Sequence, residues 1–108
     1  MRVWTRALVT GASSGIGTAM ARQLAAQGVE LVITGRNEER LAELADELGN
    51  NPEVIVADLG TSDGVDRVAQ RITASTDPVD LVINNAGLSF SGPLTEIIDT
   101  EDLSLIHI

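Results

Sequence analysis

Three glycines in one short turn constrain this chain more than any other feature of its sequence. Gly11, Gly15 and Gly17 follow the apolar run of residues 7–9, and a helical pattern begins directly after them. A strand that ends in a glycine-rich turn and opens into a helix favours phosphate binding, because backbone N–H groups and the positive end of the helix face the ligand. Ser13 and Ser14 add hydroxyls that can donate to a phosphate or cap the helix. A tight strand–helix connection without a ligand is the alternative interpretation.

The rest of the chain alternates short apolar runs with helical patterns. The runs predict four strands, at residues 6–10, 31–33, 53–57 and 81–83. Between them, apolar residues at helical spacing predict three helices, the second with Asn37 as its N-cap and the third with Ser62 as its N-cap. Leu94, Ile97 and Ile98 suggest one further amphipathic turn, so residues 94–108 are expected to form a partial helix and an irregular tail.

Four strands joined by helical crossovers predict an α/β fold with one parallel sheet and helices on both faces. The expected strand order is 3-2-1-4, with the switch point between the first and fourth strands. Ligands of such folds bind in the crevice beyond the carboxyl ends of the strands. The glycine turn and the segment at residues 84–87 both lie there. We expect one domain over residues 1–108, incomplete, with its motifs between residues 7 and 93.

The end of the second strand indicates which dinucleotide is bound. In NAD-binding folds an acidic residue about 20 positions after the glycines binds the ribose 2′-hydroxyl. Here Gly35 stands at about that spacing and Arg36 follows it. A guanidinium can pair with a 2′-phosphate, which a carboxylate would repel. The sequence therefore predicts a preference for NADP(H), with NAD less favoured. An exposed arginine without a ligand role is the alternative.

Two further segments complete a family pattern. Asp58 and Leu59 follow the third strand, and the sequence Asn-Asn-Ala-Gly at residues 84–87 follows the fourth. With the TGxxxGIG turn at residues 10–17, these segments resemble the short-chain dehydrogenase/reductase family, and the match spans residues 7–93. The resemblance implies a Rossmann-like, doubly wound fold. The cofactor-binding residues that it implies are Gly11, Ser13, Ser14, Gly15, Ile16, Gly17, Arg36, Asp58, Leu59, Asn85, Ala86 and Gly87.

The resemblance also implies a role for several of these residues. It gives Asp58 as the acceptor of a hydrogen bond from the adenine amino group, although a polar strand end is the alternative. It gives Leu59 as packing on the adenine ring. Residues 85–87 line the adenosine and ribose side of the cofactor, and Asn84 is the more structural of the two asparagines.

Members of this family move a hydride between nicotinamide and a carbonyl or alcohol carbon. A tyrosine acts there as general acid and base, and a nearby lysine lowers its pKa. The 108 residues contain no tyrosine and no lysine, so we assign no catalytic residue. We expect the cofactor-binding part of a longer, homo-oligomeric enzyme that acts on a small carbonyl or alcohol substrate, with this fragment inactive and marginally stable. A non-catalytic dinucleotide-binding module, or a half-domain that assembles through an open edge of the fourth strand, remains an alternative.

Composition excludes several other classes of protein. A net charge of −9 argues against nucleic-acid binding, which needs a basic surface. The chain has no cysteine and no metal-ligand spacing, and its single histidine, His107, lies in an apolar tail without a carboxylate close by in sequence. No secretory signal or membrane-length apolar run is present. By elimination we predict a cytoplasmic protein without a metal or a membrane partner.

Overall fold

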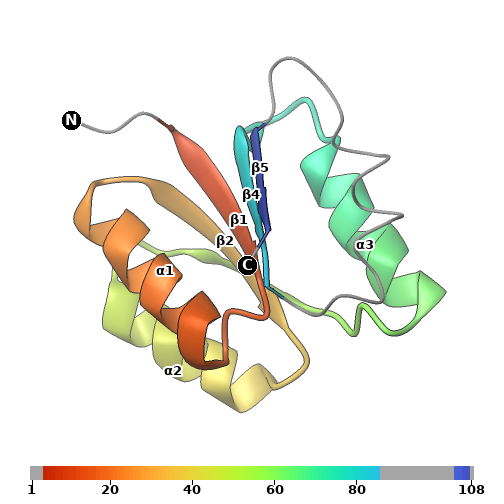
Figure 1. Ribbon diagram of the computed structural model, residues 1–108, viewed down its shortest axis with the longest axis horizontal. Helices are drawn as coiled ribbons and strands as arrows, with labels where there is room; N and C mark the ends of the chain where they lie inside the picture. The colour runs from red at the N-terminus through yellow and green to blue at the C-terminus, as the bar shows by residue number, and fades with distance from the viewer. Residues whose placement is uncertain (1–3, 86–103, 108) are drawn as a thin grey trace.

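The computed structural model describes residues 4–85 and 104–107 of the chain. Its strands and helices alternate along the sequence up to the last strand (Figure 1). The strands are β1 (Arg6–Thr10), β2 (Glu30–Gly35), β3 (Glu53–Val56), β4 (Leu81–Asn84) and β5 (Ser104–His107). The helices are α1 (Gly15–Ala26), α2 (Glu38–Leu48) and α3 (Ser62–Ile72).

The strands form one parallel sheet in the order β3-β2-β1-β4-β5. Figure 1 shows α1 and α2 together on one face of this sheet and α3 on the other. The predicted α/β fold and the predicted order 3-2-1-4 are therefore confirmed. The switch point lies between β1 and β4, because the chain leaves β1 toward β2 on one side and returns to β4 on the other.

The central strands are buried on both faces, which explains their continuous apolar runs. Alternate residues of β1 face opposite layers. Val9 packs in the same cluster as Leu24 of α1 and Leu41 of α2. Leu8 packs in a second cluster with Val68 of α3. Each layer of helices thus covers its own apolar face of the sheet.

The two later helices begin with capping side chains. Asn37 accepts a hydrogen bond from the backbone N–H of Arg40, at 3.1 Å, as an N-cap does. The prediction for α3 was wrong by one residue. Thr61 is the cap, accepting from Gly64 N–H at 3.0 Å, and Ser62 is the first helical residue. The Thr61 hydroxyl also donates to the Asp58 carbonyl, and this contact with the preceding turn selects Thr61.

The end of the chain differs from the prediction. Residues 104–107 form the strand β5, which pairs in parallel with β4 from Leu81↔Ser104 to Asn84↔His107. The predicted irregular tail is therefore wrong for these residues, and so is the predicted open edge of the fourth strand. An apolar segment that pairs there satisfies N–H and C=O groups that an edge strand leaves free. The predicted amphipathic turn at residues 94–98 lies outside the described residues.

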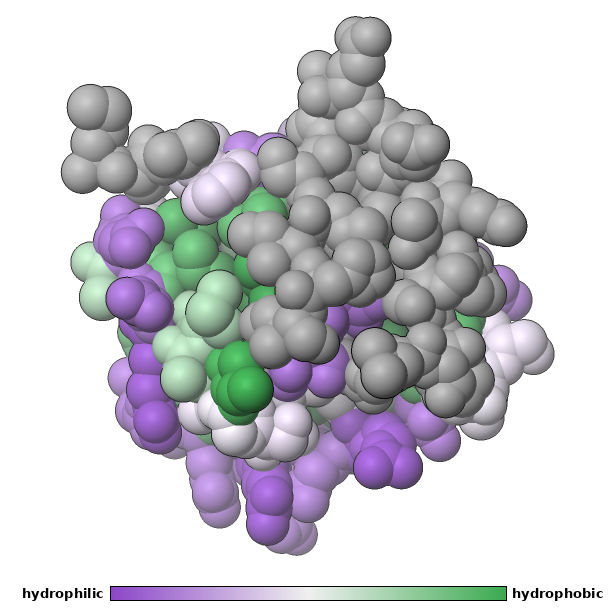
Figure 2. All heavy atoms as spheres, in the orientation of Figure 1, coloured by the Kyte–Doolittle hydropathy of each residue, from purple (hydrophilic) through white to green (hydrophobic). Residues whose placement is uncertain are grey.

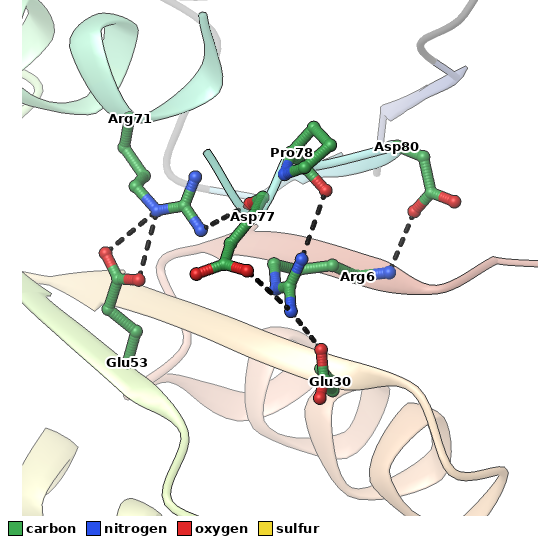
Figure 3. A network of polar contacts seen from close by, with 7 residues as sticks. All are labelled: Arg6, Glu30, Glu53, Arg71, Asp77, Pro78 and Asp80. Carbon is green, nitrogen blue, oxygen red and sulfur yellow. Dashed lines mark hydrogen bonds and ion pairs between the residues drawn. The ribbon is translucent and has the colours of Figure 1, made fainter. Parts of the chain in front are cut away.

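Polar contacts tie the amino ends of the strands together (Figure 3). The Asp80 carboxylate, just before β4, accepts hydrogen bonds from the backbone N–H groups of Thr5 and Arg6, both at 2.9 Å. The Arg6 guanidinium forms an ion pair with Glu30 of β2. These contacts join β1, β2 and β4 at the end of the sheet opposite the switch-point crevice.

A second arginine extends these contacts to the other edge of the sheet. Arg71 of α3 donates from Nε to both carboxylate oxygens of Glu53 in β3, at 3.0 and 2.9 Å. It also donates to the Asp77 carbonyl, at 2.8 Å. Figure 3 shows these residues converging from α3, β3 and the turn before β4. These contacts tie the amino ends together, although Arg71 Nη1 is buried without a hydrogen-bond partner among the described residues.

An exposed ion pair links the two helices on the other face. Arg22 of α1 donates two hydrogen bonds to the Glu47 carboxylate of α2, one of them at 2.9 Å. The hydrogen bond lowers the pKa of Glu47 below its ordinary value, and the charge of Arg22 acts in the same direction.

Figure 2 shows hydrophilic residues along the lower rim of the molecule in that view, the rim where the three helices begin in Figure 1. Within the described residues, no helix combines the length and the apolar composition that a membrane crossing requires. Among the described residues, the large apolar side chains that remain exposed are Ile16 and Val54.

Candidate functional site

A cavity of about 380 Å³ opens at the carboxyl ends of the strands. Its walls come from the turn after β1, the end of β2, the turn after β3 and the residue after β4. The lining residues are Gly11, Ser13, Ser14, Thr34, Gly35, Arg36, Ala57, Asp58, Leu59, Gly60 and Asn85. Four segments that are distant in sequence and were predicted to share a site therefore do lie around one cavity.

The glycine turn is closed by a close backbone approach. Gly11 takes a positive φ of 62° at the start of the turn. Its carbonyl accepts hydrogen bonds from Ser14 N–H at 3.2 Å, from Ser14 Oγ at 3.0 Å and from Asn85 Nδ2 at 3.3 Å. A Cβ on Gly17 would stand 2.3 Å from that carbonyl oxygen and 2.6 Å from Asn85 Nδ2. Gly17 thus allows α1 to start directly against the turn.

The amino end of α1 is left without a capping side chain. Ser14 occupies the N-cap position, but its side chain accepts no capping hydrogen bond, and the first turn of α1 holds no acidic residue. By contrast, α2 and α3 each have a side-chain cap and at least one acidic residue in the first turn. A Cβ on Gly15 would meet no atom within 4 Å. The positive end of α1 is therefore open to an anionic group.

Arg36 lines the cavity from the end of β2. Its side chain is exposed and forms no hydrogen bond or ion pair with the described residues. It also lines a wider groove with Ser13 and Ser14, so that its guanidinium and the glycine turn face the same space. A Cβ on Gly35 would stand 3.1 Å from Ser13 Oγ, which shows how closely the end of β2 approaches the glycine turn.

On the far wall, the turn after β3 orients a carboxylate and an apolar side chain. The Asp58 Oδ1 atom accepts a hydrogen bond from Gly60 N–H at 2.7 Å. Leu59 is buried against the α3 side of the sheet. The second carboxylate oxygen of Asp58 accepts no hydrogen bond from the described residues, and both Asp58 and Leu59 line the cavity.

Thr10 joins the ends of β1 and β4 under the cavity. Its hydroxyl donates toward Asn84 Oδ1 at 3.1 Å and accepts from Asn85 N–H at 2.9 Å. Asn84 is buried, so this hydrogen bond gives it a structural role. Asn85 faces the glycine turn instead, and this pair of asparagines connects the two segments on either side of the switch point.

The structure does not place the remaining predicted residues at the cavity. Ile16 is 57% exposed at the start of α1 and does not line the cavity. Ala86 and Gly87 lie outside the described residues. Four lining residues were not among the predicted site residues: Thr34, Gly35, Ala57 and Gly60. A polar residue in the apolar run of β2 was the available signal for Thr34, whose buried Oγ1 has no hydrogen-bond partner in the described part of the chain.

No cluster of three or more potential metal ligands occurs within residues 4–85 and 104–107. The cavity is lined by backbone N–H groups, hydroxyls, the Asn85 carboxamide, one guanidinium and one carboxylate. Such a set suits a phosphorylated organic ligand.

A doubly wound parallel sheet with a glycine turn at its switch point defines the dinucleotide-binding class of α/β folds. The family model of short chain dehydrogenases matches residues 5–108. The chain therefore belongs to the short chain dehydrogenase family, and it corresponds to the N-terminal portion of its relatives.

Individual relatives agree with this assignment. The chain is 41% identical over 90 residues to an uncharacterized oxidoreductase of Staphylococcus epidermidis, a match covering 83% of this chain and 39% of that protein. It is 38% identical over 82 residues to an NADP-dependent 3-hydroxy acid dehydrogenase of Shigella flexneri, covering 76% and 33%. A short-chain dehydrogenase from Sphingobium yanoikuyae in complex with NADPH superimposes with a TM-score of 0.72 at 36% identity, covering 78% and 34%. The chain thus spans well under half the length of these relatives.

Proposed function

We propose that this chain binds NADP(H) and is the cofactor-binding part of an oxidoreductase that transfers a hydride between nicotinamide and a carbonyl or alcohol carbon. The observation that carries the proposal is the Arg36 guanidinium, which pairs with no group in residues 4–85 or 104–107 and faces the same space as the uncapped amino end of α1. Two anion-binding groups side by side suit a ligand with a pyrophosphate and a separate 2′-phosphate. The NADPH bound to the Sphingobium relative and the NADP dependence of the Shigella relative support the same ligand.

The residues of the cavity fit this cofactor. The backbone N–H groups at the start of α1 would hold the pyrophosphate, since Gly15 leaves the approach to them free of side-chain atoms. Arg36 would pair with the 2′-phosphate, and the Asp58–Leu59 wall would hold the adenine. When bound, the nicotinamide supplies the carbon that gives or takes the hydride.

The proton transfer that accompanies the hydride needs groups that this chain does not contain. Its 108 residues include neither a tyrosine nor a lysine. We therefore expect this chain alone to bind the cofactor without turnover of a carbonyl substrate.

The test compares NADPH with NADH on two arginine variants. Arg36→Ala removes the proposed 2′-phosphate contact, and Arg22→Ala removes the same charge from α1, where the side chain lines neither the cavity nor the wider groove. A charge-assisted hydrogen bond is worth about 1.5–3 kcal/mol, and at this exposed site we expect the low end of that range, or roughly tenfold in affinity. Isothermal titration calorimetry should thus show a tenfold loss for NADPH with Arg36→Ala, and little change for NADH.

The Arg22→Ala control separates direct pairing from general attraction. If net charge alone attracts the phosphates, both variants should weaken NADPH binding equally, and added salt should abolish the difference from wild type. Equal weakening of NADPH and NADH by Arg36→Ala would refute the assignment of Arg36 to the 2′-phosphate. Failure of the wild-type chain to bind either nucleotide would refute the proposed function itself.

A further inference from the structure

The first turn of α3 packs against the backbone of Asp58 more closely than a side chain would allow. Gly64 lies in that turn and is buried. A Cβ on Gly64 would stand 1.9 Å from the Asp58 carbonyl oxygen, 2.5 Å from its carbonyl carbon and 2.9 Å from its nitrogen. All three atoms belong to the backbone, so no flexible side chain could move aside to make room. Glycine is a poor helix former, and its presence inside α3 fits this steric requirement.

Hydrogen bonds of Thr61 also join the Asp58 carbonyl to the first turn of α3. The Thr61 hydroxyl donates to the Asp58 carbonyl at 2.8 Å and accepts from Gly64 N–H at 3.0 Å. The backbone N–H of Thr61 donates to the same Asp58 carbonyl, at 3.0 Å. The carbonyl of Asp58 is therefore held by the helix end that Gly64 brings into place.

The position of this carbonyl determines where the Asp58 side chain lies. Asp58 Oδ1 is held by Gly60 N–H within the turn, so the carboxylate moves with the backbone. Asp58 also lines a second cavity, of about 350 Å³, together with Thr61 and Gly64. The turn after β3 thus has space on two sides, and the contact with α3 is what fixes it.

We propose that Gly64 is a positioning residue for the adenine-binding wall of the cofactor site, acting through the backbone of Asp58. This inference rests on the proposed function, in which the Asp58–Leu59 wall holds the adenine, and on the hydrogen bond from the adenine amino group to Asp58 that the family resemblance implies. Gly64 itself touches no part of the ligand. It allows α3 to approach closely enough that the Asp58 carboxylate points at a fixed place on the ring, and so it contributes to the choice of adenine over other purines.

The test measures a preference between two bases. NADPH is compared with its analogue in which hypoxanthine replaces adenine, because the analogue lacks the amino group that Asp58 would bind. Isothermal titration calorimetry on the 108-residue chain gives the ratio of the two affinities. We expect wild type to prefer NADPH by about tenfold, as one hydrogen bond to a charged group allows. Gly64→Ala should reduce this ratio to about 1, mainly by weakening NADPH.

Two further variants keep the test decisive. Ser62→Ala changes an exposed residue in the same turn of α3 and should leave the ratio unchanged. If Gly64→Ala does not fold, Thr61→Val takes its place: it removes the bridging hydroxyl without adding a clash, and it should lower the ratio, whereas Thr61→Ser should restore it.

The outcomes distinguish this inference from the proposed function. A wild-type chain that does not bind NADPH overturns the proposed function. A wild-type chain that binds NADPH without preference for adenine overturns the role of Asp58 and, with it, the role of Gly64. A folded Gly64→Ala variant that keeps the wild-type ratio, or that weakens both nucleotides equally, shows that Gly64 does not position the adenine wall.

Discussion

Replacing Gly17 by alanine tests whether the glycine turn is closed by steric necessity. The added Cβ would lie 2.3 Å from the Gly11 carbonyl oxygen. A contact of this kind is essentially never shorter than 3.0 Å, so the carbonyl has to withdraw by roughly 0.7 Å. That movement strains three hydrogen bonds, two from Ser14 and one from Asn85.

The magnitude follows from these contacts. Forcing an extra methyl group into a packed site costs about 1–3 kcal/mol. Each strained hydrogen bond adds up to about 0.5–1.5 kcal/mol. Alanine regains about 1 kcal/mol of helix propensity over glycine. The expected net loss in the free energy of unfolding of Gly17→Ala is therefore about 2–4 kcal/mol, a large part of the total for a small domain.

Urea denaturation followed by far-UV circular dichroism measures this loss. Gly15→Ala is the matched control, because it makes the same substitution two residues earlier in the same helix and meets no atom within 4 Å. We expect the control to unfold at the wild-type urea concentration or slightly above it, while its Cβ obstructs the approach of NADPH to the helix end. If Gly17→Ala unfolds at the same urea concentration as Gly15→Ala, the steric argument fails.

Two other perturbations act away from the cavity. Asp80→Ala removes the acceptor of the backbone hydrogen bonds from Thr5, just before β1, and Arg6, its first residue. We expect it to lower the free energy of unfolding by about 1–3 kcal/mol in urea denaturation and to leave the NADPH affinity unchanged. The hydrogen bond from Arg22 lowers the pKa of Glu47 in the folded chain. Ionised Glu47 therefore stabilises the fold at pH values above the pKa that Glu47 has in the unfolded chain. This contribution is lost as the pH falls through the lower pKa of the folded chain. Wild type should therefore exceed Glu47→Gln in stability at neutral pH and lose that advantage in acid, and a gap that persists at pH 2–3 would contradict this reasoning.

Much of the fold could be predicted from the sequence because its signals are local. The continuous apolar runs of β1 and β4 reflect burial on both faces, and each helix shows its apolar spacing. The strand order then followed from short right-handed crossovers. β5 could not be predicted in this way, since residues 104–107 carry no periodicity that separates a strand from a helix. Their pairing with β4 is decided by contact with a distant segment.

The groups of the candidate site that face the ligand could be predicted from the sequence, but the residues that hold those groups in place could not. The glycine spacing, Arg36 and Asp58 can be read directly as groups that suit a dinucleotide. The sequence could not predict that Thr61 rather than Ser62 caps α3, because adjacent hydroxyl residues have similar capping propensities. Thr61 is the cap because its hydroxyl also donates to the Asp58 carbonyl. The close approach of Gly64 was similarly hidden, although a glycine within a helical pattern is itself a signal of tight packing.

The two ends of the sheet differ in whether the charged groups that the structure describes are paired, and this difference leads to a last prediction. At the amino ends, ion pairs and backbone hydrogen bonds join Arg6, Arg71 and Asp80 to their neighbours. At the carboxyl ends, the start of α1 has no side-chain cap and Arg36 has no partner within the described residues. A ligand that supplies those partners binds the folded chain and not the unfolded one. NADPH at 100 times its dissociation constant should then raise the free energy of unfolding by about 2.7 kcal/mol. Arg36→Ala should show a smaller increase at the same NADPH concentration, because its affinity is lower. A urea midpoint that NADPH does not move would mean that these groups are left open for some other reason.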